Sequence, residues 1–193
     1  MPAGGTGLVL RGLRKEPATI GKWHLGWDLT YKEGKAKTVD NIDFTKRVAN
    51  GPTDRGFDYF YGLTSPSGPP HLYMVNDMAE KQPNTRFEES GGGLYKIKGG
   101  IGHSDWSADG MQPHLADKML EYLDENKDSD KPFFLYMALT APHIPLFPSK
   151  EFKGKSKIGD YGDLVMMIDD IVGRVNRKLK EIGKYDNTIV MFA

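Results

Sequence analysis

The 193-residue chain contains no cysteine, which excludes disulfide bonds and thiolate metal ligands. No run of apolar residues approaches the roughly 20 that cross a bilayer as a helix, and residues 1–7 lack the regions of a signal peptide. Neither sign of charge is in excess, because 26 Lys and Arg residues balance 26 Asp and Glu residues. No global field favours nucleic acid as a partner, so any anion site has to be a local cluster.

Apolar patterning predicts an α/β fold. Residues 18–20, 133–139 and 188–192 are short apolar runs typical of buried strands, and helical spacing predicts helices over residues 112–125 and 161–182. Gly183 is the expected C-terminal cap of the second helix. Alternation of strands with helices indicates a doubly wound, mostly parallel sheet flanked by helices, and the length suits a single domain.

The rest of the chain has weaker patterning. Residues 27–113 are rich in Gly, Pro, Asn and Asp, which predicts a long loop-rich excursion. Within it, residues 94–98 alternate between glycine clusters and predict a small hairpin strand. Residues 8–16 could form a short helix, although Gly12 weakens it.

The hexapeptide GKWHLG at residues 21–26 is the most informative stretch of the chain. It places Lys22 and His24 directly after the first predicted strand, and ligands bind at the carboxyl ends of strands in open α/β sheets. An ammonium beside an imidazole suits an anionic oxygen. The alternative is a glycine-flanked turn with two incidental polar residues. A second histidine, His143, follows the strand at 133–139 and can reach the same edge.

Four segments in order resemble the sulfatase family, the formylglycine-dependent hydrolases of the alkaline-phosphatase-like fold. The hexapeptide is similar to that family's second signature, and GPTDRGFDYFYG (51–62) is similar to the segment after it. KPFFLYMA (131–138) with APHIP (141–145), and then residues 161–175, resemble the following strand, loop and helix. The resemblance covers residues 18–193 and identifies them as part of a catalytic domain, whereas residues 1–17 look unrelated.

The resemblance implies a role for each candidate residue. Lys22 and His24 would neighbour the hydrated formylglycine and the sulfate oxygens, and His143 would hold a sulfate oxygen and protonate the leaving alcohol. His71 and His103 lie in the excursion, where they are candidates to touch the organic part of a substrate; solvated loop histidines are the alternative. The implied substrates are sulfate esters of small aryl compounds or glycans.

Departures from the family pattern are as informative. No Cys or Ser stands in the C/S-x-P-S-R context that yields formylglycine, and the paired aspartates of the family's first strand are absent. The "S-D-N-G" stretch expected after residues 188–192 is missing too. We therefore expect no metal ligands in this chain, although the complete family enzyme uses calcium, and we expect the chain alone to be inactive. A complete member would be periplasmic or secreted.

Two other functions remain open at this point. A phosphonate or phosphate ester hydrolase of the same fold would use similar cations. A catalytically dead module that binds sulfated or phosphorylated ligands fits the loss of nucleophile and metal ligands equally well.

Overall fold

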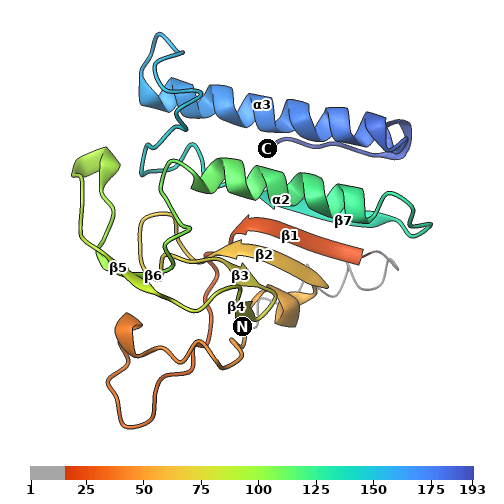
Figure 1. Ribbon diagram of the computed structural model, residues 1–193. Helices are drawn as coiled ribbons and strands as arrows, with labels where there is room; N and C mark the ends of the chain where they lie inside the picture. The colour runs from red at the N-terminus through yellow and green to blue at the C-terminus, as the bar shows by residue number, and fades with distance from the viewer. Residues whose placement is uncertain (1–15) are drawn as a thin grey trace.

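The computed structural model describes residues 16–193 and shows a five-stranded sheet with two long helices stacked beside it (Figure 1). This sheet consists of β1 (Glu16–Lys22), β2 (Tyr59–Leu63), β3 (Met74–Val75), β4 (Met78–Ala79) and β7 (Phe133–Ala138). A separate two-stranded sheet is formed by β5 (Thr85–Phe87) and β6 (Gly100–Gly102). The long helices are α2 (Met111–Glu125) and α3 (Asp160–Glu181).

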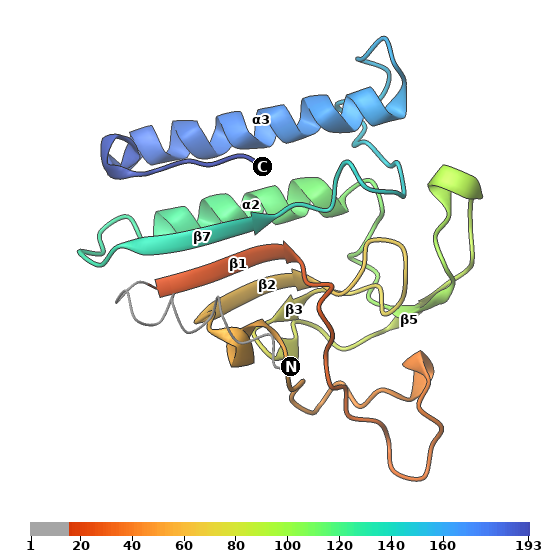
Figure 2. The ribbon, with the colours of Figure 1, turned by 180° about the vertical axis from the view of Figure 1, so that it is seen from behind.

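The main sheet has the order β4-β3-β2-β1-β7 and is parallel at its centre (Figure 2). β1 pairs in parallel with both β2 and β7, so that Gly21 lies opposite Gly62 on one side and Ala138 on the other. β3 and β4 add antiparallel strands beyond β2. The carboxyl ends of β1, β2 and β7 therefore meet at one edge of the sheet, as the sequence predicts for β1 and β7.

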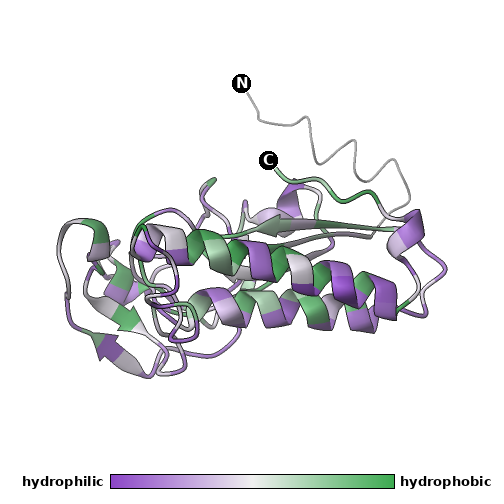
Figure 3. Ribbon diagram, turned by 90° about the horizontal axis from the view of Figure 1, so that it is seen from above, coloured by the Kyte–Doolittle hydropathy of each residue, from purple (hydrophilic) through white to green (hydrophobic). Residues whose placement is uncertain are grey.

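Both predicted long helices are confirmed to within a residue or two. The apolar stripe of α2, with Leu115 and Met119 fully buried, packs between the sheet and the buried stripe of α3, and this layer is the larger core of the protein. Seen from above, the two helices run alongside each other on the same side of the sheet (Figure 3). Gly183 follows α3 in the left-handed conformation, with φ of 69°, as a C-terminal cap requires.

A smaller core covers the opposite face near β2 and β3. Phe60 and Met74 from these strands pack with Ile42, Phe44 and Val48 of the excursion. Because Phe60 alternates with Tyr61 and Leu63 along β2, one strand contributes to both cores. The excursion is otherwise loop-rich, as expected: it supplies β2, β3 and β4 of the main sheet and the short pair β5 and β6.

The structure corrects three sequence predictions. Residues 94–98 are not a hairpin strand: Gly93–Tyr95 is a 3-10 turn, and the hairpin pairs are β5 and β6 on either side of it. Residues 188–192 form no strand, and because this segment pairs with no strand of the sheet, Ile189 and Met191 remain 87% and 83% exposed. β7 itself is an edge strand with one face open, so its Tyr136 is 53% exposed rather than buried.

Predictions for the N-terminal part of the chain lie partly outside the residues that the structure describes. The helix expected over residues 8–16 falls almost wholly on residues that lie outside them. β1 extends the predicted strand 18–20 to Glu16–Lys22, so Glu16 and Pro17 pair with β7. The division into segments 1–17 and 18–193 stays a prediction. Among residues 16–193, no helix is both long enough and apolar enough to cross a membrane.

Candidate functional site

The carboxyl end of β1 presents Lys22 and His24 on either side of a buried tryptophan. Trp23 is 7% exposed; its backbone N–H donates to Leu63 O at 2.9 Å, and its indole Nε1 donates to Gly26 O at 3.2 Å. These contacts fix the loop, while Lys22 is half-buried and His24 is exposed. Lys22 alternates with Ala18 and Ile20, which belong to the core under α2, so it lies on the helix-covered face of the sheet.

Two glycines allow the backbones of β1, β2 and β7 to approach each other closely next to this lysine. Gly21 has φ of 131°, and a Cβ built there would lie 1.9 Å from Ala138 O of β7. A Cβ at Gly62 of β2 would lie 1.8 Å from Gly21 O. Only residues without a side chain fit this close backbone approach, which explains the glycine directly before Lys22.

His143 lies in the loop after β7, the strand adjacent to β1. The loop contains cis peptide bonds before Pro142 and Pro145. The exposed imidazole is oriented by its Nδ1, which donates to Ile144 O at 2.5 Å. Because a carbonyl oxygen can only accept, Nδ1 carries the proton in the neutral ring, and Nε2 is the atom left to exchange a proton with a ligand.

Gln112 and Thr140 connect α2 to this loop, although no motif in the sequence singles out either residue. The Thr140 backbone N–H and Oγ1 donate to Gln112 Oε1 at 3.2 and 2.5 Å. Gln112 and Thr140 are 2% and 3% exposed. The available signal was a polar residue in line with Leu115 and Met119 on the apolar stripe of the helix.

His71 and His103 lie together in the excursion, away from the other three candidates in sequence. The His103 backbone N–H donates to His71 O at 2.9 Å. His71 is 1% exposed, so the solvated-loop alternative is wrong for it: Nε2 donates to Lys98 O at 2.8 Å and the ring packs on Trp106 and Phe87. Burial lowers the pKa of His71. His103 is partly exposed, with Nδ1 3.5 Å from Asp105 Oδ2. Their role as substrate contacts stays a prediction.

A partly buried polar network ties β2 to the start of α2. Tyr61 Oη donates to Glu80 Oε2 at 2.8 Å and lies 2.6 Å from His114 Nε2, which therefore donates to it. Tyr73 stacks against the rings of both Tyr61 and His114. Burial raises the pKa of Tyr61, helped by Glu80, and burial lowers the pKa of His114. These shifts keep both groups neutral near pH 7, which suits a packing role.

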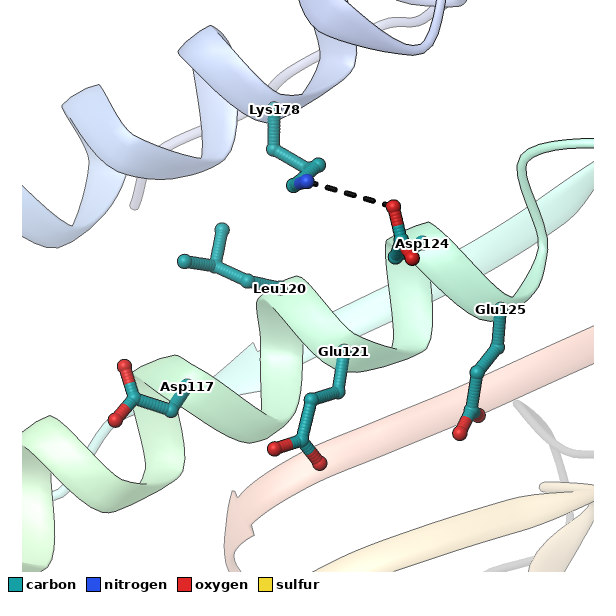
Figure 4. Close-up of a pocket in the computed structure, with 6 residues that line it drawn as sticks. All are labelled: Asp117, Leu120, Glu121, Asp124, Glu125 and Lys178. Atoms are coloured by element: carbon teal, nitrogen blue, oxygen red, sulfur yellow. Dashed lines mark hydrogen bonds and ion pairs between the residues drawn. The ribbon is translucent and has the colours of Figure 1, made fainter.

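A groove of about 470 Å³ lies between α2 and α3, far from the strand ends (Figure 4). Its lining is mostly acidic, with Asp117, Glu121, Asp124 and Glu125 from α2, and Lys178 of α3 pairs with Asp124 across it at 3.4 Å. An acidic groove repels an anionic ligand, so it is not the site that Lys22 and His24 predict.

The described residues do not fit a calcium site. Among residues 16–193, no three His, Asp or Glu side chains are gathered in a way that could hold a metal ion. Asp169 and Asp170 are sequence neighbours on the solvent side of α3, and Asp170 pairs with Arg177 at 3.6 Å. Lys22 and His24 follow β1 and His143 follows β7, and among residues 16–193 none of them belongs to a group of three or more His, Asp or Glu side chains that could hold a metal ion.

Comparison with known proteins gives a consistent result. A family model described as Sulfatase matches residues 9–193. An N-acetylgalactosamine-6-sulfatase of Sus scrofa is 30% identical over 188 residues, which cover 95% of this chain and 31% of that protein. An N-acetylgalactosamine-6-O-sulfatase of Bacteroides thetaiotaomicron is 26% identical, with 90% of this chain and 38% of that protein covered. The chain thus spans about a third of the length of these curated relatives.

Solved structures agree on the fold. A Bacteroides thetaiotaomicron structure described with that organism's metabolism of glycosaminoglycans aligns with a TM-score of 0.71 and 21% identity, covering 93% of this chain and 42% of that one. A Pseudoalteromonas sulfatase aligns with a TM-score of 0.61 and 22% identity, covering 92% and 34%. The family match over nearly the whole chain shows that this chain belongs to the sulfatase family.

Proposed function

We propose that the complete protein hydrolyses sulfate esters and that this chain supplies the cationic side of its active site. The observation that carries the proposal is topological. Lys22 and His24 end β1, and His143 follows β7, which pairs with β1 in parallel. Parallel neighbours deliver their following loops to one edge of the sheet, where α/β proteins bind ligands.

The chemistry of the three residues suits sulfate transfer. The Lys22 ammonium supplies fixed positive charge for sulfate oxygens, which carry negative charge in both the ester and its transition state. His143, held through Nδ1 by Ile144 O, can donate a proton from Nε2 to a departing alkoxide when it is charged. His24 adds a further donor beside Lys22. Each residue binds an oxygen or moves a proton, and none is placed to act as nucleophile.

The nucleophile and the metal are not assigned to this chain. Its sequence lacks the C/S-x-P-S-R motif, and its described residues hold no group that fits calcium. We therefore expect the 193-residue chain to bind an anion without turning over a sulfate ester. This absence also favours the second candidate, a dead anion-binding module.

The substrate class follows from the relatives. Several of them are named N-acetylgalactosamine-6-sulfatases, which supports a sulfated glycan as the substrate of the complete protein. A periplasmic or secreted location is part of the same proposal, because the family resemblance implies it.

The test compares hydrolysis of a generic aryl sulfate by two proteins, this chain and a version extended in frame by the flanking genomic sequence, with and without calcium. We expect turnover only in the extended protein, and a loss of at least about 100-fold in Lys22→Met or His143→Gln. Lys127→Met, at the opposite edge of the sheet, removes the same charge and should leave activity unchanged. Calcium-dependent turnover by the 193-residue chain would contradict the assignment of the nucleophile elsewhere. Hydrolysis of an aryl phosphate in preference to the sulfate would favour a phosphoesterase, and no hydrolysis of either would favour the dead module.

A further inference from the structure

Gln112 and Thr140 form a buried contact that lies beside the candidate site and is not explained by packing alone. Gln112 is the second residue of α2, and Thr140 lies two residues beyond the end of β7. Their side chains are nearly inaccessible, and Gln112 Oε1 accepts both the backbone N–H and the hydroxyl of Thr140. One acceptor atom thus holds both polar donors of a single loop residue.

The orientation of the Gln112 amide is fixed by this contact. A backbone N–H can only donate, so the side-chain atom 3.2 Å from Thr140 N has to be the oxygen. The Nε2 group then points away from Thr140, and among the described residues this buried nitrogen has no hydrogen-bond partner. Buried polar groups without partners are rare in folded proteins, so this one calls for a reason to keep a glutamine here.

The reason we infer for a glutamine at this position is that its contact lies where the chain leaves β7 toward His143. Thr140 stands three residues before His143, at the point where the chain leaves the sheet. The backbone N–H of Leu139 donates locally, to Met137 O at 3.0 Å, while its side chain packs against the larger core. The Gln112 contact adds a buried polar link between the start of α2 and the loop that carries His143. Lys22 lies on the same helix-covered face of the sheet.

We propose that Gln112 is a positioning residue that sets His143 against Lys22 by holding Thr140, and that it acts on anion binding through the loop. The anion-binding part rests on the proposed function. Gln112 does not touch the ligand, because both of its polar atoms are buried. Its acceptor oxygen fixes the direction in which the loop leaves β7, and thereby the distance between the imidazole and the ammonium.

The experiment uses the isotope-labelled 193-residue chain and inorganic sulfate, with chloride at equal ionic strength as the reference. Sulfate binding is followed by the Cε1–H signals of His24 and His143, and loop order by amide exchange of Thr140 and His143. The variants are Gln112→Met, which keeps the length of the side chain, Thr140→Val, which loses the hydroxyl, and Thr140→Ser, which retains it. Gln82→Met is the matched control, because the Gln82 amide donates to Phe44 O in the excursion.

We expect sulfate binding to weaken about three- to tenfold in Gln112→Met and Thr140→Val, with faster exchange of the loop amides in both. Thr140→Ser should restore wild-type values, and Gln82→Met should change neither readout. Near-UV circular dichroism checks that each variant is folded at the measuring temperature. If Gln112→Met is unfolded, Gln112→Leu takes its place.

The outcomes separate the two proposals. If folded Gln112→Met binds sulfate as the wild type does, or Thr140→Ser fails to rescue, the positioning role is wrong. If wild-type protein shows no sulfate-dependent shift at His24 or His143, the proposed function fails, and the loop exchange rates still decide whether Gln112 orders the loop. Unchanged exchange in Gln112→Met would then overturn the positioning role.

Discussion

Individual residues at the carboxyl ends of the strands combine close packing with exposed chemistry. Gly21 and Gly62 allow three backbones to approach each other, and Lys22 follows immediately. Trp23 then returns to the smaller core, which leaves His24 exposed on the surface. The alternation of buried and more exposed residues over this short stretch places Lys22 and His24 on a well-packed base, and rigid placement is what an anion site needs.

The first prediction concerns the glycine at the end of β1. We expect Gly21→Ala to destabilise the fold by at least about 3 kcal/mol, because its methyl group would overlap Ala138 O and the residue holds a positive φ. Gly26→Ala is the control: its φ is also positive, at 92°, but nothing lies within 4 Å of the added Cβ. It should cost about 1 kcal/mol through backbone strain alone. Urea unfolding measures both, and equal losses would show that the steric argument is wrong.

The second prediction is a pH dependence from the buried His71 and the half-buried His114. Burial holds the pKa of His71 and of His114 below the ordinary value of 6.5. The unfolded chain therefore binds more protons than the folded one below about pH 6.5, so stability present above that pH is lost as the pH falls toward the folded pKa values.

Urea midpoints measured between pH 7.5 and 5 check this dependence. His71→Gln and His114→Gln should each flatten the decline. Trp106→Phe, which disturbs the packing beside His71 without removing a titrating group, should lower stability at every pH and leave the slope unchanged. A wild-type stability that rises on acidification through this range would contradict the assignment.

At the scale of elements, the stack of sheet, α2 and α3 holds the molecule together. The two helices join through their apolar stripes and through exposed ion pairs such as Arg174 with Asp117 at 2.5 Å. Exposed pairs contribute about 0–1 kcal/mol each, so the apolar stripes dominate.

The third prediction measures this contribution with two methionines. Met119 of α2 is fully buried, and Met166 of α3 is 41% exposed. We expect Met119→Ala to cost about 2–5 kcal/mol by leaving a cavity between the helices and the sheet. Met166→Ala should change stability by no more than about 0.5 kcal/mol. Similar losses for the two variants in thermal or urea unfolding would contradict this description of the core.

The elements also show what local patterning could predict. The two long helices and strands β1 and β7 are confirmed, because each carries an apolar period that holds within its own segment. The sequence did not predict β2 as a strand, because Tyr59–Leu63 contains aromatic residues and a glycine without a simple alternation of apolar and polar residues. Its pairing with β1 joins residues about 40 positions apart, and no local pattern records such a partner.

At the scale of the whole molecule, the unpaired edge of the sheet at β7 is the feature that most favours association between chains. β7 has no strand beyond it in the part of the chain that the structure describes, and apolar residues 189–192 are exposed. Unpaired strand edges and exposed apolar segments promote association between chains.

The fourth prediction is therefore concentration-dependent association of the 193-residue chain. Phe192 is 76% exposed in the apolar terminal segment, and Ile158 is similarly exposed, at 75%, in the loop before α3. We expect Phe192→Lys to reduce association more than Ile158→Lys, although both add the same charge. Sedimentation velocity over a concentration series measures the difference. A monomer at all concentrations, with a sharp cooperative thermal transition, would show that the open edge is harmless.

The sequence by itself determined the fold class, the two long helices, the central strand and the identity of Lys22, His24 and His143 as candidates. Those features depend on short-range periodicity and on motifs that are contiguous in the chain. The tertiary structure alone decided the contacts between distant segments, namely the Gln112–Thr140 link, the burial of His71 against Trp106, and the absence of pairing for residues 188–192. Each depends on which surfaces meet after folding, and the residues adjacent to a position in the sequence do not specify its partner in a distant segment.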